Sequence, residues 1–274
     1  MRSSSLPLVC ALFTLAASAA SAQSLADRVD HAPESRTVTF QVPAQKNVCG
    51  YGDAMIRFHD ASPRGYSVMW HRGDWNDFEG VETAELRERC EFGALHVLLE
   101  RDGRRITEVS ARIAATPPAN ALGVGAATTA EAADYLVGTV ARNASRRVAG
   151  EAMVVLTVAE GEYWQPLLAL ARDRSAAEDI RKQAVFWVGQ AAEARATQGL
   201  RSILGDESEE IAVRESAVFA LSQQKNPEST DALMELAQTA KEPKIRRSAL
   251  FWLGQKADDD PRVLALFEKI LVGK

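Results

Sequence analysis

Apolar and polar residues alternate along the first half of the chain, as they do in half-buried β-strands. The strands expected from this alternation span residues 38–42, 66–70, 94–100 and 105–113. The last two are joined by a turn containing Asp102 and Gly103, and an Asp-Gly pair favours a tight hairpin. The pattern predicts a β-rich module over residues 23–115.

A different period governs the second half, where one helical pattern occurs three times. The copies span Ile180–Gln190, Val213–Gln223 and Ile245–Gln255, so they lie 33 and 32 residues apart. A weaker copy at Val148–Leu156 precedes the first by 32 residues. Apolar residues recur every three or four positions within each copy, as on one face of an α-helix. A fixed period of this kind indicates a stack of structural repeats.

Shorter amphipathic segments lie between the copies, so each unit is expected to hold two helices. These segments are Trp164–Arg172, Thr197–Leu204, Thr230–Ala237 and Pro261–Leu271. Residues 128–143 would supply an additional helix. Pro, Gly, Ala and Thr dominate residues 116–128, which we interpret as a linker to a helical array over residues 129–274.

The N-terminus has the features of a secretory signal peptide. Arg2 precedes an apolar run, and Ala20-Ser21-Ala22 fits the small-residue pattern of a signal-peptidase site. We expect residues 1–22 to be removed before Gln23, so that the mature protein is periplasmic or secreted. No later stretch is long and apolar enough for a transmembrane helix, and we expect no integral membrane segment in the mature chain.

Composition and cysteine count narrow the possible partners and the compartment. The chain of 274 residues has 32 Lys+Arg against 37 Asp+Glu, a net charge of −5, which argues against nucleic acid as a partner. Loss of Cys10 with the signal leaves Cys49 and Cys90, each in a turn-like segment that contains glycine and lies outside the expected strands. In an exported protein such a pair is expected to form a disulfide. A redox-active pair is the weaker alternative, because there is no Cys-x-x-Cys.

The repeated pattern, aliphatic-Arg-x-x-Ala-aliphatic-x-x-aliphatic-Gly, resembles HEAT repeats, especially the short bacterial kind. Ser222 stands where the second copy would carry Gly. The resemblance implies structural roles in the repeat for Arg181, Arg214, Arg246, Ala184, Ala217 and Ala249. Together with the strand alternation and the cysteine pair of the first half, it predicts an α+β multidomain protein, with a small disulfide-bearing β-rich N-terminal module followed by an all-α HEAT-like solenoid of about four helical hairpins. The combination also resembles uncharacterised exported bacterial HEAT-repeat proteins.

Helical geometry separates packing positions from outward positions on the repeated helix. Ala184 and Trp187 fall in the apolar stripe, whereas Phe186 falls on the opposite side, and Phe219 and Phe251 occupy the same register. The candidates for a binding face are Lys182, Gln183, Phe186, Gln190, Glu215, Phe219, Gln223, Arg247, Phe251 and Gln255. Second helices usually line the concave face of such solenoids, and a row of exposed rings needs a partner or a cover.

We therefore expect this face to bind a protein or peptide whose identity the sequence does not disclose. The main alternative is that curvature of the array, or the β-rich module folding back, buries the three rings. An aromatic cluster near Trp70, Trp75 and Phe78 is interpreted as core and hairpin packing rather than as a ligand platform.

No constellation for catalysis, a metal or a cofactor is apparent. The four histidines, His31, His59, His71 and His96, lack the spacing of a metal site, and neither His nor Cys follows His96. We expect a non-enzymatic binding or scaffold protein without cofactor or metal. The alternatives are a HEAT-like lyase and a purely structural envelope component.

Overall fold

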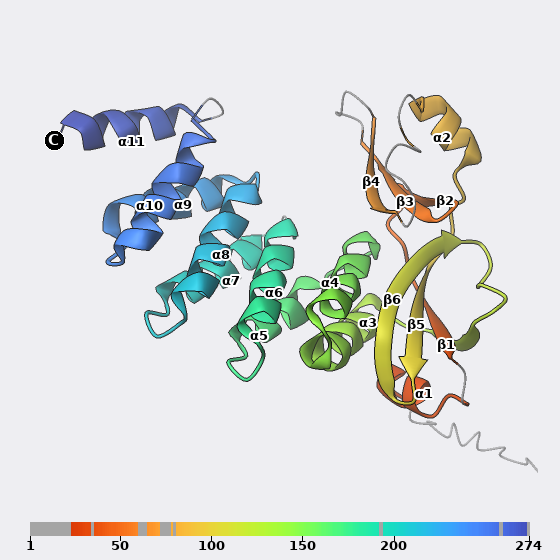
Figure 1. The fold of residues 1–274 in the computed structure, drawn as a ribbon. Helices are drawn as coiled ribbons and strands as arrows, with labels where there is room; N and C mark the ends of the chain where they lie inside the picture. Colours follow the sequence, from red (N-terminus) through yellow and green to blue (C-terminus); the bar gives the residue numbers. More distant parts are fainter. Residues whose placement is uncertain are drawn as a thin grey trace, which may run out of the picture.

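The computed structural model describes residues 23–33, 36–59, 65–71, 78, 81–191, 194–257 and 260–272. Two sheets lie at one end of the molecule, and a row of helices leads away from them to the C-terminus (Figure 1). A β-rich N-terminal region followed by a run of helices confirms the predicted fold class. The expected signal peptide and the Trp75 part of the aromatic cluster lie outside the described residues.

The larger sheet has four strands in the order β6-β5-β1-β7. They are β1 (Thr37–Val42), β5 (Ala94–Asp102), β6 (Arg105–Ala114) and β7 (Leu122–Ala126). The predicted β5–β6 hairpin is present, with Gly103 at a φ of +59°, as its turn requires. β7 pairs parallel to β1, so the segment expected to be a linker, residues 116–128, contributes an edge strand to this sheet.

The smaller sheet has three antiparallel strands, β2 (Val48–Tyr51), β3 (Ala54–Phe58) and β4 (Tyr66–His71), and α2 (Thr83–Arg89) accompanies it. Cys49 and Cys90 form the predicted disulfide, with their Cα atoms 5.6 Å apart. Contrary to the expectation that both cysteines lie outside strands, Cys49 belongs to β2, and Cys90 ends α2. The disulfide joins strand to helix beside a small separate core that includes Ile56.

The helical region consists of paired helices, as the repeat predicted. α3 (Thr129–Tyr135) continues into a π-helical turn at 136–141 and pairs with α4 (Arg146–Val154). The following pairs are α5 (Trp164–Arg172) with α6 (Glu178–Gln190), α7 (Ala194–Gly205) with α8 (Ile211–Gln223), and α9 (Pro227–Thr239) with α10 (Pro243–Gly254). α11 (Pro261–Val272) follows them. The second helices, α4, α6, α8 and α10, contact one another in that order.

Arginine and alanine hold the two helices of a unit together. Arg181 Nε donates to the carbonyl oxygen of Ala171 at 3.0 Å, and the guanidinium of Arg214 donates to that of Leu204 at 3.1 and 3.2 Å. Arg246 donates to two carbonyls at the end of α9. Each arginine therefore satisfies carbonyl groups that the first helix leaves open at its C-terminus. Ala184, Ala217 and Ala249 are fully buried.

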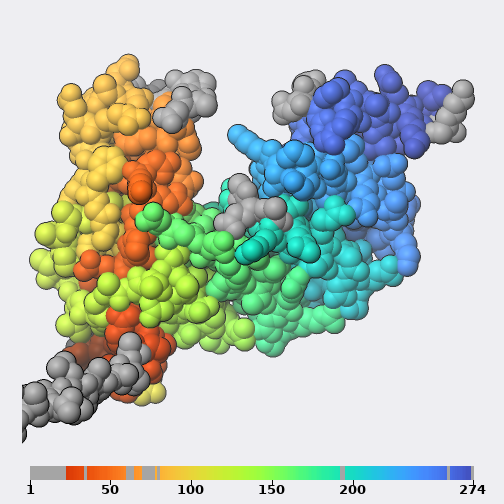
Figure 2. Space-filling view, turned by 180° about the vertical axis from the view of Figure 1, so that it is seen from behind, coloured from red at the N-terminus to blue at the C-terminus, as the bar shows by residue number. Residues whose placement is uncertain are grey.

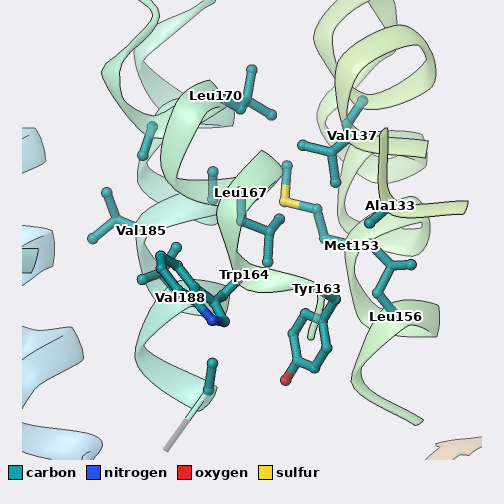
Figure 3. Packing of buried hydrophobic residues seen from close by; sticks show 14 of the residues in the cluster. Ala133, Val137, Met153, Leu156, Tyr163, Trp164, Leu167, Leu170, Val185 and Val188 are labelled. Carbon is teal, nitrogen blue, oxygen red and sulfur yellow. The ribbon is translucent and has the colours of Figure 1, made fainter. Parts of the chain in front are cut away.

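The larger sheet and the helices share one hydrophobic core. The Phe40 ring meets the Tyr135 ring edge-on, with centroids 6.4 Å apart, and the core continues through Met153 and Leu167, which Figure 3 shows between neighbouring helices. Backbone contacts reinforce this junction, since Gln45 N donates to Val158 O at 2.9 Å. The sheet thus covers the first end of the helical array.

Short α1 (Leu25–Asp30) covers the β7 edge of the same sheet. Leu25 and Val29 are buried in the shared core, and Arg28 Nη1 donates to the carbonyl oxygens of Val124 at 2.9 Å and Ala126 at 2.8 Å. Those carbonyls would otherwise form an open strand edge. The whole molecule has a U-shaped outline, with a hollow between the smaller sheet and the C-terminal helices (Figure 2).

Candidate functional site

The face formed by α6, α8 and α10 carries all ten of the predicted binding-face residues. Phe186, Phe219 and Phe251 occupy the same register on the three helices. Residues four positions before each Phe and four positions after it lie one helical turn away on the same face. The face therefore has a central aromatic band with a polar band on either side.

The aromatic band is a continuous series of ring contacts. The Phe186 and Phe219 rings stack with centroids 6.1 Å apart and planes at 11°. Phe219 then contacts Trp252 at 4.9 Å, and Trp252 contacts Phe251 at 4.9 Å. Trp187 meets Phe186 at 4.8 Å. We call these five residues the aromatic ladder.

The ladder differs from the simple row of three phenylalanines that the sequence suggested. Phe251 is 59% exposed, whereas Phe186 and Phe219 are half-buried because they cover each other. Trp252 intervenes between Phe219 and Phe251, and Trp187 packs against the core while its ring also meets Phe186. The rings are therefore neither fully buried, as the alternative expectation held, nor fully exposed.

Close approach of α6 and α8 explains the Phe186–Phe219 stack. A Cβ atom added to Gly189 would lie 2.7 Å from the Cβ of Ala220, which is too short for any side chain at that position. Gly189 lies three residues after Phe186 on α6, and Ala220 directly follows Phe219 on α8, so the close contact of the two helices lies next to the stacked rings. The signal was present in the sequence as Gly189 and as the Phe-Trp pairs at 186–187 and 251–252, but sequence alone does not give the rotation between helices.

The band on the N-terminal side of the ladder is charged. Lys182 Nζ pairs with Glu178 at 3.3 Å, and Glu215 pairs with Lys244 at 2.6 Å across neighbouring units. The guanidinium of Arg247 is exposed and makes no hydrogen bond or ion pair with other residues in the described part of the chain. The charges within each of these two ion pairs cancel. The guanidinium of Arg247 therefore gives the charged band a net positive charge.

The band on the C-terminal side consists of glutamines. Gln190, Gln223 and Gln255 are exposed, and Gln223 Nε2 donates only to Ser222 Oγ, at 3.2 Å. Gln183 behaves differently, because its Nε2 donates to the carbonyl oxygen of Arg146 at 3.3 Å and its Oε1 is buried. Gln183 therefore joins α4 to α6, and the three exposed glutamines form the free polar band.

A ring nitrogen of each of His31, His59 and His96 lies within hydrogen-bond distance of a nearby oxygen atom. His31 Nδ1 lies 2.8 Å from Asp27 O, and His59 Nε2 lies 2.8 Å from Ser67 Oγ. His96 is fully buried beside Ala114 O, and burial lowers the pKa of its imidazole. No three His, Cys, Asp or Glu side chains gather as metal ligands among the residues described. The side chain of His71 lies outside that part.

None of the helices in the described residues is both long enough and apolar enough to span a membrane. No curated protein matches the chain. Residues 165–254, from α5 to the end of α10, match the family model of HEAT repeats. The matched segment contains the whole aromatic ladder and both polar bands up to Gly254. The paired helices from α5 to α10 are therefore similar to HEAT repeats, and the run of helices that follows the disulfide-bearing β region fits a HEAT-repeat family.

Proposed function

We propose that this protein is an exported, non-enzymatic scaffold that binds a protein or peptide on the second-helix face of its HEAT repeats. HEAT repeats suggest a scaffold or interaction role and are usually non-catalytic. The observation that carries the proposal is the aromatic ladder, which continues across three helices and ends in the exposed Phe251 ring. Large aromatic surface of this kind is enriched where proteins meet.

Export is supported by the signal-like N-terminus and by the Cys49–Cys90 disulfide, since disulfides persist mainly outside the reducing cytosol. Cell fractionation followed by N-terminal sequencing tests this part directly. The expected product starts at Gln23 and is found outside the cytosol. A cytosolic protein that retains Met1 would contradict export and leave the binding proposal standing.

Site-directed photo-crosslinking tests the binding face. A benzoyl-phenylalanine placed at Gln223 lies beside the ladder. The control carries the same group at Gln238, an exposed position on the first helix α9. We expect a discrete adduct in the native host from position 223 and none from position 238. That adduct should disappear when Phe251→Ser is added. Adducts from both positions, or an adduct that persists in the Phe251 variant, would overturn the proposed face.

A further inference from the structure

The width of the second-helix face limits what can lie on it. The polar bands are each four residues from the ladder, so at a rise of 1.5 Å per residue they are about 12 Å apart. A folded partner normally covers about 800 Å² on each side, which is a much broader patch. The apolar strip between the bands has instead the width of a single polypeptide segment.

Its length follows from the spacing of the helices. Packed helices lie about 8–10 Å apart, so the ladder from α6 to α10 spans about 20 Å and the path from α4 to α10 about 30 Å. An extended chain advances about 3.3 Å per residue, which corresponds to roughly six to nine residues. A segment crossing α6, α8 and α10 would meet one ring of the Phe186 register and one glutamine in each of these three units.

The glutamine band distinguishes an extended segment from a helical one. A primary amide offers two N–H donors and a carbonyl acceptor. The side-chain amides of Gln190 and Gln255 make no hydrogen bond within the described residues, and that of Gln223 donates only to Ser222 Oγ, at 3.2 Å. The backbone N–H and C=O groups of an extended segment need partners, whereas those of a helix are already bonded to each other. Three free amides in a row therefore suit an extended backbone.

Charge sets the remaining chemistry of the partner. Three acidic side chains along the face are paired with cations, Glu151 with Arg147, Glu178 with Lys182, and Glu215 with Lys244. The Arg146 and Arg247 guanidinium groups are exposed and have no partner among the described residues. Arg247 lies on α10 in the charged band, and Arg146 is the first residue of α4, the helix that contacts α6 at the other end of the row. This local positive charge contrasts with the net charge of −5 of the whole chain.

We propose that the second-helix face recognises an extended, apolar polypeptide segment of about six to nine residues that carries acidic side chains towards its ends. The ladder binds the apolar side chains, the glutamine band binds the backbone, and Arg146 and Arg247 attract the carboxylates. This inference rests on the proposed function and specifies the partner of the same face.

Fluorescence anisotropy with defined peptide mixtures tests it on the mature chain, residues 23–274. The probe is a fluorescein-labelled mixture of nonapeptides with Asp at both ends and Val, Ile or Phe alternating with Ser or Thr between them. One matched mixture has Lys at both ends, another carries N-methyl groups on alternate backbone nitrogens, and a third is stapled as a helix. We expect the Asp mixture to bind at least tenfold more tightly than each of the others.

Variants assign the discrimination to the named residues. The double variant Arg146→Glu, Arg247→Glu should reverse the preference for Asp over Lys, because it replaces two cations by carboxylates. Both side chains are exposed, so we expect the fold to tolerate the two changes. Changing Gln190, Gln223 and Gln255 to Ala should reduce affinity for the Asp mixture to that of the N-methylated mixture. Circular dichroism melting confirms that each variant is folded.

The outcomes separate this inference from the broader proposal. Equal binding of the stapled and unstapled mixtures, or no binding of any mixture, overturns the extended acidic segment. If the position-223 adduct still forms and requires Phe251, a folded partner occupies the face and the proposed function stands. If that adduct is also absent, both the function and its partner class fail.

Discussion

Arg181 is only 1% exposed, although its guanidinium is always charged and is costly to bury without a partner. It is stabilised by the carboxylate of Glu209 in the next repeat and by the Ala171 carbonyl. One buried ion pair therefore joins two successive units. Arg214 and Arg246, at the same repeat position, donate hydrogen bonds only to backbone carbonyls among the described residues. Of the three arginines, Arg181 alone also pairs with a carboxylate there.

Replacing Arg181 by Ala leaves the buried Glu209 carboxylate without its cation. Breaking one side of a buried pair costs about 3–5 kcal/mol of the free energy of unfolding. The matched control is Arg174→Ala, which removes the exposed pair with Asp206 and should cost at most about 1 kcal/mol. Urea unfolding followed by circular dichroism measures both. Equal losses in the two variants would contradict a structural role for the buried pair.

His96 gives the stability a dependence on pH. Burial lowers the pKa of its imidazole below the ordinary 6.5, and its Nδ1 has no hydrogen-bond partner within the described residues. The unfolded chain therefore takes up a proton at a higher pH than the folded chain does. As pH falls below 6.5, protonation favours the unfolded state and the free energy of unfolding decreases.

The variant His96→Gln removes this titration while keeping a polar side chain. Between pH 7.5 and 5.5, the wild-type protein should lose more stability than the variant, with the comparison made by urea unfolding at each pH. Other groups titrate equally in both proteins, so the difference isolates His96. Parallel losses in the two proteins would show that burial does not hold the imidazole neutral.

At the scale of elements, the smaller sheet packs partly on a core of its own, although its Val48 and Met55 belong to the shared core. Ile56, Phe58 and Leu86 pack around the disulfide, apart from the core that the larger sheet shares with the helices. On the loop-entropy account, a link between residues separated by 41 positions stabilises the native state by about 4 kcal/mol. That contribution should act on β2–β4 and α2 rather than on the repeats.

Changing Cys49 and Cys90 to Ser tests this localisation. Hydrogen exchange of β2 and β3 amides should accelerate by a factor of about a thousand, since about 4 kcal/mol corresponds to nearly three powers of ten. Amides of α6 and α8 should keep their protection. Unchanged exchange in β2 and β3 would place their stability elsewhere, and accelerated exchange in α6 would contradict the separate core.

Other elements show where sequence patterns suffice and where they do not. β1, β5 and β6 were predictable because each is long enough for alternation to register. β2 and β3 were missed because nearly every residue in them is buried, which removes the alternation. β7 was read as linker because its sequence, LGVGA, is rich in small residues, and its place is fixed by β1 and by Arg28, far away in the chain.

At the scale of the molecule, the repeat period predicted the helical array but not its union with the sheet. Periodicity reports which face of an element is apolar, and contacts such as Phe40 with Tyr135 decide what that face packs against. The candidate site likewise has one part that periodicity predicts and another that depends on tertiary packing. The positions of Phe186, Phe219 and Phe251 came from helical register, while the insertion of Trp252 into the ladder depends on how α8 and α10 pack.

The central claim is that the aromatic ladder, rather than exposed apolar surface in general, binds the partner. Phe251 and Leu264 are suited to test it, because they are 59% and 50% exposed and only Phe251 belongs to the ladder. Each can be changed to Ser without opening the core.

The most direct measurement is the dissociation constant of the Asp-ended nonapeptide mixture, or of the partner identified by crosslinking, for the two variants. The Phe251→Ser protein should bind at least tenfold more weakly than wild type, in keeping with loss of about 1.4 kcal/mol or more from an aromatic contact. The Leu264→Ser protein should bind like wild type. Equal affinities for wild type and Phe251→Ser, or equal weakening in both variants, would contradict the ladder as the binding site.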